Sequence, residues 1–152
     1  MSAPPDGLPV TIRLSFPPQP RLLGAVRLVV GIVARKAGID DEGIEDLKVA
    51  ASETCAVAVN DLLRAGLDEP IELELIDDHE RFGVEVRDHA PGLDPGDPDV
   101  GRLDAEVDDR QFGLALVGAL VDDLHTEALP DGGHSTRFWL RKQVDRLPPP
   151  LT

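Results

Sequence analysis

Hydrophobic residues alternate with polar ones along five short segments of the chain and recur at helical spacing along three others. The two-residue period predicts strands at about 10–16, 70–77, 81–88, 125–129 and 134–142. The 3.6-residue period predicts helices at about 20–37, 42–65 and 113–123, of which the first two end at Gly38 and Gly66. This order of elements predicts an α/β two-layer sandwich, in which a mixed, mostly antiparallel sheet carries helices on one face.

Three segments lack such a pattern. Residues 1–7 and 143–152 are predicted to be disordered, which leaves 8–142 as a single domain. Residues 90–110 contain seven acidic residues, three prolines and three glycines, and they are predicted to form a mobile loop. Because this loop lies between two glycine-bearing segments, the pattern favours a lid over a disordered insert.

The strand at 81–88 ends in a carboxylate that points inward. Phe82, Val84 and Val86 form its apolar row, and Asp88 continues that row. A buried carboxylate is costly unless it meets a hydrogen-bond donor, and the exocyclic amino group of a purine is such a donor. The Gly/Pro loop that follows would let a ligand approach the backbone closely. Many strands end in turns of this kind, so the feature gains weight only from its neighbours.

The helix at 42–65 carries a glutamate opposite its core stripe. The apolar stripe consists of Ile44, Leu47, Ala51, Cys55, Ala58 and Leu62. Glu53 lies on the other side with Val49, Val57 and Asn60. Partial cover by these side chains would suit Glu53 to act as a general base, whereas a solvated glutamate on an ordinary helix is the alternative. Cys55 falls on the core stripe, so we interpret it as a buried hydrophobe.

Two further positions carry candidate chemistry. Gly113 is predicted in the first turn of a helix, where exposed backbone N–H groups suit a phosphate. Thr136 shares the parity of Phe138 in the last strand, so its hydroxyl is expected to point inward. His134 has no metal co-ligand at a suitable spacing, and we interpret it as a surface residue.

The charge of the chain limits its partners. Asp and Glu number 29 against 15 Lys and Arg, which gives a formal net charge of −14. Such a chain repels phosphate backbones and anionic lipids, so we expect no direct binding to nucleic acid or membrane. A basic protein partner is favoured, although acidity can also serve solubility alone. A single cysteine and the lack of a signal peptide or a long apolar run predict a cytoplasmic protein.

Four segments in a fixed order resemble one known family. They are Ala51-Ser52-Glu53 in a helix, the run Val86–Pro95, Arg110-x-x-Gly113-Leu114 leading to Val121-Asp122-Asp123, and Gly133-x-x-Thr136-x-Phe138. Together they are similar to the RsbW/SpoIIAB-type anti-sigma factors, and in particular to the actinobacterial branch. These proteins are serine-protein kinases of the GHKL (Bergerat-fold) ATPase superfamily. The resemblance covers residues 8–142, and the order and spacing of the motifs are more specific than any single motif.

The resemblance implies a catalytic residue, a nucleotide site and a set of partners. Glu53 matches the glutamate that activates the attacking hydroxyl. The nucleotide-binding positions are Asp88 at the adenine amino group, Gly92 in the adenine loop, Gly113 and Leu114 at the phosphates, and Thr136 near the adenine. Residues 94–112 match the ATP lid. Family members bind ATP or ADP, act as homodimers, sequester a sigma factor and are displaced by an anti-anti-sigma (STAS-domain) protein, which they phosphorylate on serine.

The departures from the family pattern separate two hypotheses. Val57 stands where the family has its Mg²⁺-binding asparagine, and Asn60 lies about 10 Å of helix rise beyond Glu53. Ala90 and Gln111 replace two glycines of the nucleotide loops. These changes favour an anti-sigma factor with a degenerate ATP site and no metal ligand over an active serine kinase. A separate histidine-kinase ATPase fragment is disfavoured, because no phospho-acceptor helix pair precedes the domain.

Overall fold

The computed structural model describes residues 9–90, 104–130 and 132–142. The elements follow the chain as strand β1 (Val10–Phe16), a short 3-10 helix (Pro20–Leu22), helices α1 (Leu23–Lys36) and α2 (Asp41–Ala65), strands β2 (Ile71–Asp77) and β3 (Arg81–Asp88), helix α3 (Asp104–Leu120), and strands β4 (Asp123–Ala128) and β5 (His134–Arg141). None of the described helices is long and apolar enough to cross a membrane.

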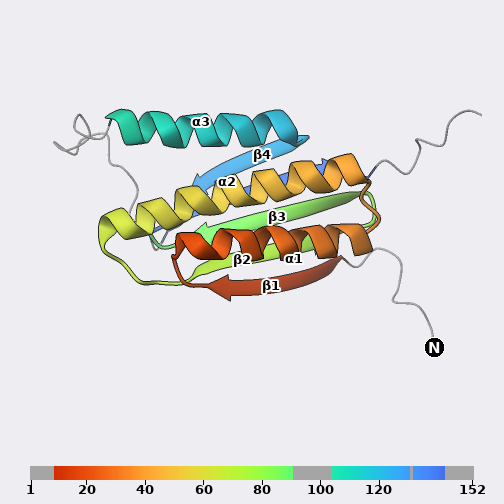
Figure 1. The fold of residues 1–152 in the computed structure, drawn as a ribbon, viewed down its shortest axis with the longest axis horizontal. Helices are drawn as coiled ribbons and strands as arrows, with labels where there is room; N and C mark the ends of the chain where they lie inside the picture. The colour runs from red at the N-terminus through yellow and green to blue at the C-terminus, as the bar shows by residue number, and fades with distance from the viewer. Residues whose placement is uncertain (1–8, 91–103, 131, 143–152) are drawn as a thin grey trace, which may run out of the picture.

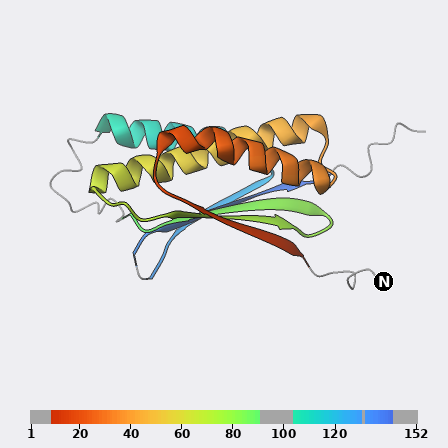
Figure 2. The ribbon, with the colours of Figure 1, turned by 60° about the horizontal axis from the view of Figure 1, so that its bottom comes forward.

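The elements form two layers (Figures 1 and 2). The three helices lie side by side over one face of a five-stranded sheet with the order β1-β2-β3-β5-β4. The four pairings among the described strands are all antiparallel, so this part of the chain shows none of the parallel pairs that the predicted mixed sheet would have. The predicted α/β two-layer sandwich of the Bergerat type is confirmed. In this sheet β3 and β5 are neighbours, which places the end of β3 next to the start of β5.

Helix α2 begins and ends where the sequence predicts. The Asp40 carboxylate accepts a hydrogen bond from the Gly43 N–H at 2.9 Å and thereby caps the first turn. At the other end Gly66 adopts a left-handed conformation, with φ of 69°, and its N–H closes the last turn. The predicted core stripe of α2 is buried throughout, from Ile44 to Leu62. This stripe packs in one core with buried residues of α1 and the inward rows of β2 and β3, which include Leu73, Leu75, Phe82 and Val84.

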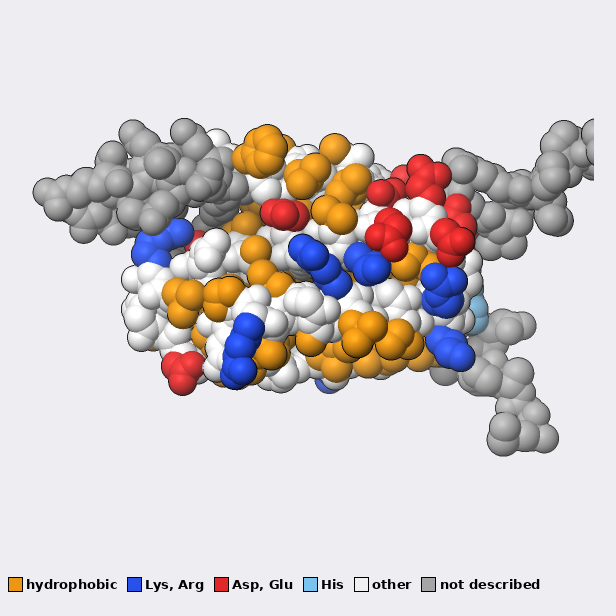
Figure 3. Space-filling view, in the orientation of Figure 1, with side chains coloured by type: hydrophobic (Ala, Val, Ile, Leu, Met, Phe, Trp, Pro, Cys, Tyr) orange, Lys and Arg blue, Asp and Glu red, His pale blue; other side chains and the backbone are white. Residues whose placement is uncertain are grey.

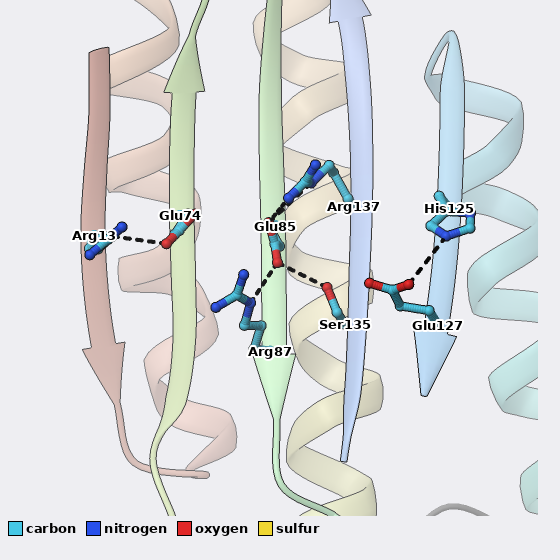
Figure 4. A network of polar contacts seen from close by, with 8 residues as sticks. All are labelled: Arg13, Glu74, Glu85, Arg87, His125, Glu127, Ser135 and Arg137. Atoms are coloured by element: carbon cyan, nitrogen blue, oxygen red, sulfur yellow. Dashed lines mark hydrogen bonds and ion pairs between the residues drawn. The ribbon is translucent and has the colours of Figure 1, made fainter. Parts of the chain in front are cut away.

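The open face of the sheet carries a polar network (Figure 4). Glu85 is 2% exposed although no helix covers this face, because its carboxylate is enclosed by Arg87, Ser135 and Arg137. Burial on its own would raise the pKa of Glu85, but the hydrogen bonds from Arg137, Arg87 and Ser135 outweigh it and hold that pKa below its ordinary value.

Helix α3 differs most from the sequence prediction. It begins at Asp104 and not at Gly113, so residues 104–110 of the predicted loop, and the segment matched to the ATP lid as far as 112, are helical. The last two strands lie within two residues of their predicted starts. The predictions for residues 1–7, 91–103, including Gly92, and 143–152 fall outside the described residues.

Candidate functional site

Glu53 lies on the side of α2 that faces α3. Its side chain is half-buried, and a Cβ atom placed on Gly113 of α3 would stand 3.5 Å from Glu53 Oε2. The same Cβ would stand 3.8 Å from Val57 Cγ2. The contact between α2 and α3 therefore brings together Glu53, Val57 and Gly113, which are far apart in sequence.

The residues beside Glu53 do not fit a Mg²⁺ ion. Val57, one helical turn after Glu53, presents only methyl groups, and Mg²⁺ requires oxygen ligands. Asn60 is exposed and stands a further turn along the helix. Within the described segments, no group of three or more His, Cys, Asp or Glu side chains could hold a metal ion. Cys55 is fully buried, and burial raises the pKa of its thiol to about 12, as expected for a core residue.

Asp88 is held in place by backbone contacts at the end of β3. It is 5% exposed, so its predicted inward orientation agrees with its burial, and its Oδ1 accepts a hydrogen bond from the Ala90 N–H at 2.9 Å. The backbone of Gly133, with φ of 97°, runs directly against it. A Cβ atom at Gly133 would lie 2.1 Å from the Asp88 carbonyl oxygen, so only glycine allows this approach.

Thr136 lies close to Asp88 on the neighbouring strand. In the β3–β5 register Val86 faces Thr136 and Asp88 faces His134, so Thr136 is diagonal to Asp88. Thr136 is 8% exposed and shares its row with the fully buried Phe138. The inward parity predicted for Thr136 thus agrees with its burial, and the sheet brings it together with Asp88.

Gly113 does not have the environment that the sequence predicts. It is buried in the middle of α3, nine residues after Asp104, and its N–H lies inside the helix and not at a free helix end. Leu114, next to it, is half-buried. The acceptor at Asp88 suits the amino group of a base, whereas the N–H of Gly113 is not free for a phosphate in this arrangement.

His134 is a residue of this region that the sequence interpretation missed. Its side chain is 13% exposed, and its Nδ1 lies 3.5 Å from Asp88 Oδ1, so the surface assignment is wrong. The parity that placed Thr136 and Phe138 inward applies equally to His134, and this signal could have identified it.

Comparison with known proteins defines the class. The histidine kinase-like ATPase domain family matches residues 16–141, which is most of the chain. The chain is also similar to proteins named serine-protein kinase RsbW. That of Oceanobacillus iheyensis is 33% identical over 74% of this chain and 76% of the relative. That of Bacillus licheniformis is 28% identical over 88% and 89%, and that of Halalkalibacterium halodurans is 27% identical over 90% and 88%.

The fold, the strand-end carboxylate and the helix glutamate thus have a common explanation. The chain belongs to the histidine kinase-like ATPase family, in its RsbW-type branch. The resemblance to RsbW-type proteins inferred from the sequence motifs is confirmed, and the family is one of ATP-binding domains. The narrower similarity to the actinobacterial branch stays a prediction.

Proposed function

We propose that this protein is an anti-sigma factor with a degenerate ATP site. It would sequester a sigma factor as a cytoplasmic homodimer and be countered by an anti-anti-sigma protein with a STAS domain. Membership of the RsbW-type branch supports this regulatory class. The observation that carries the degenerate site is Val57, which lies beside Glu53 under Gly113 where a metal ligand would be needed.

The two ends of the site support this proposal differently. Asp88 keeps a buried acceptor for the adenine amino group, with Thr136 beside it. The phosphate end lacks a side-chain oxygen at position 57, and the Gly113 N–H lies within α3. Phosphoryl transfer depends almost wholly on positioning and on metal neutralisation of charge. We therefore expect ATP or ADP to bind weakly, Mg²⁺ to bind poorly, and transfer to be slow or absent.

An active serine kinase is the second candidate. Glu53 remains half-buried beside α3, in the place that suits a general base, and the similar proteins carry the name serine-protein kinase. For this function the turns of α3 before Gly113 would have to unfold, so that the Gly113 N–H could reach a phosphate.

A transfer assay distinguishes the two candidates. The partners are first identified by co-purification from the native host, and the anti-anti-sigma protein is then incubated with this chain, labelled ATP and Mg²⁺. We expect little or no labelling by the natural chain and a gain in Val57→Asn, which places an amide oxygen one turn from Glu53. Val57→Ala is the matched control, since it removes the methyl groups without adding an oxygen. Adding Glu53→Gln to Val57→Asn should abolish the gain.

Two results would decide against the degenerate site or against the regulatory class. Rapid Mg²⁺-dependent labelling of a serine by the natural chain would show that another group supplies the metal ligand. Failure to recover any sigma factor, with transcription by the host polymerase unaffected by added protein, would contradict the anti-sigma function itself.

A further inference from the structure

Asp88 and His134 form a directly opposed pair at the end of β3 and the start of β5. Both side chains belong to the inward rows of their strands and are largely buried. The Nδ1 of His134 lies 3.5 Å from Asp88 Oδ1. This distance is slightly longer than an ordinary N–H···O hydrogen bond.

The same ring nitrogen is buried without a hydrogen-bond partner among the described residues. Buried polar atoms are nearly always satisfied, and the nearby Asp88 oxygen offers an acceptor. In neutral histidine only one of the two ring nitrogens carries a proton, whereas both do so in the charged form. Protonation of the ring therefore ensures a donor on Nδ1 and places a positive charge against the carboxylate.

Among the described residues, Asp88 of β3 is the one charged group within ion-pair distance of the ring, and the β4 residue opposite His134 is Ala128. Glu127 of β4 pairs with His125 on the open face of the sheet. The last turns of α2, at the same end of the molecule as the end of β3 (Figure 1), carry Asp61 and Arg64, which contact each other at 3.4 Å. Asp88 is thus the charged group that responds most directly to His134.

We propose that His134 is a positioning residue that tunes Asp88 as an acceptor, and that the charged ring weakens base binding at this carboxylate. The inference rests on the proposed nucleotide site. Asp88 Oδ1 already accepts the Ala90 N–H. A second donor from His134 would compete with the amino group of a base for the same carboxylate and would neutralise part of its charge. Binding of the base is therefore stronger when His134 is neutral.

A first experiment tests the contact without any nucleotide. In a ¹H–¹⁵N spectrum of the imidazole groups at pH 5.5, the proton on His134 Nδ1 should exchange slowly with water and be visible. It should disappear in Asp88→Ala, which removes the acceptor oxygen. His125, whose side chain is 72% exposed, is the internal control and should show no such protected proton. A His134 ring proton that stays equally protected in Asp88→Ala would overturn the proposed contact.

A second experiment measures the consequence for binding. Calorimetric titration with ATP is compared at pH 6 and pH 8 for the natural chain, His134→Gln and His125→Gln. Because the phosphates of ATP also titrate, the comparison is made between variants. Between pH 8 and pH 6, the affinity for ATP should fall by a factor roughly fivefold larger in the natural chain and in His125→Gln than in His134→Gln. Circular dichroism establishes that each variant is folded, and His134→Asn replaces the Gln variant if that one is not.

The outcomes separate this inference from the function on which it rests. Equal pH dependence in all three folded proteins would overturn the role of His134 while leaving the nucleotide site intact. No ATP binding by any variant would contradict the nucleotide site, and with it the effect on base binding. The ring-proton spectrum would then still decide whether Asp88 holds His134.

Discussion

At the scale of single residues, Gly133 of the Gly-x-x-Thr motif is required at the end of β3 for a steric reason. A Cβ atom at Gly133 would collide with the Asp88 carbonyl oxygen at 2.1 Å, and φ there is 97°. Gly133→Ala should therefore lower the free energy of unfolding by about 2–4 kcal/mol, which combines backbone strain with a steric clash. Urea denaturation measures this loss.

Gly132 provides the matched control for that change. It also has a positive φ, of 92°, but a Cβ there would meet nothing within 4 Å. Gly132→Ala should cost only the backbone strain, about 1–2 kcal/mol. Equal losses in the two variants would mean that the backbone at Gly133 moves away from Asp88 without difficulty.

Glu85 gives a pH-dependent prediction at the same scale. Its pKa is lower in the folded protein than its ordinary value of 4.5, so its contribution to stability is present above pH 4.5 and is lost as the pH falls through the folded-state value. At pH 7, Glu85→Gln should lower the free energy of unfolding by about 1–3 kcal/mol through weakened hydrogen bonds to Arg137 and Arg87. At pH 3 the difference from the natural chain should shrink.

A second glutamate on the open face of the sheet tests whether the enclosure of Glu85 causes the predicted loss of stability. Glu74 pairs with Arg13 at 2.9 Å, and the two side chains are 17% and 79% exposed. Because the Arg13 partner lies largely in solvent, a pair of this kind contributes about 1 kcal/mol or less. Glu74→Gln should therefore change stability little at either pH. A loss at pH 7 as large as that of Glu85→Gln would contradict the explanation.

At the scale of the elements, the sequence predicted every strand and two helices because their patterns repeat over whole elements. A two-residue period was enough to predict the inward rows from Phe82 to Asp88 and from Thr136 to Phe138. The end of α2 was predicted from Gly66 alone. The start of α3 was missed because the prolines and glycines of 91–101 dominate the composition of the window that includes 104–112. The contact of Gly113 with Glu53 was also out of reach, since spacing along a chain does not state which faces of two helices meet.

Gly113 provides the prediction that belongs to this scale. Because it lies inside α3 and a Cβ would meet its neighbours at ordinary contact distances of 3.5 and 3.8 Å, Gly113→Ala should stabilise the protein by about 0.5–1 kcal/mol. If nucleotide binding requires α3 to open at this point, the same variant should bind ATP more weakly. Thermal denaturation and calorimetry measure the two effects.

The control for this change is Gly118, on the same helix. It is exposed, and a Cβ there would stand 3.6 Å from Leu124 Cδ2, away from Glu53. Gly118→Ala should stabilise the helix similarly without altering ATP binding. Destabilisation by Gly113→Ala would show instead that α3 does not pack over Glu53 as a continuous helix in solution.

At the scale of the whole molecule, the acidic side chains are unevenly distributed over the helical face. Figure 3 shows acidic side chains gathered at one end of this face, and the first turns of α2 carry Asp41, Glu42, Glu45 and Asp46. Burial, followed by the neighbouring carboxylates of Glu42 and Asp40, raises the pKa of Asp46, which indicates mutual repulsion. Lys and Arg side chains lie beside this cluster, around a groove of about 230 Å³ that includes Arg27, Lys36 and Lys48.

This distribution predicts how the proposed partner, a basic sigma factor, would associate with the protein. The association rate should fall steeply between 50 and 500 mM salt, because long-range attraction is screened over about 14 Å at the lower concentration and about 4 Å at the higher.

Glu42→Lys should slow association more than Glu69→Lys, although both sites are exposed and both changes add two positive charges. The reason is that Glu42 belongs to the acidic end of α2, where the repulsion among carboxylates would be relieved by a cationic partner. Stopped-flow measurements with the co-purified sigma factor give the rates, and circular dichroism verifies that both variants fold. Rates that are indifferent to salt would remove electrostatic steering from the proposed function, and equal slowing by the two variants would assign it to net charge alone.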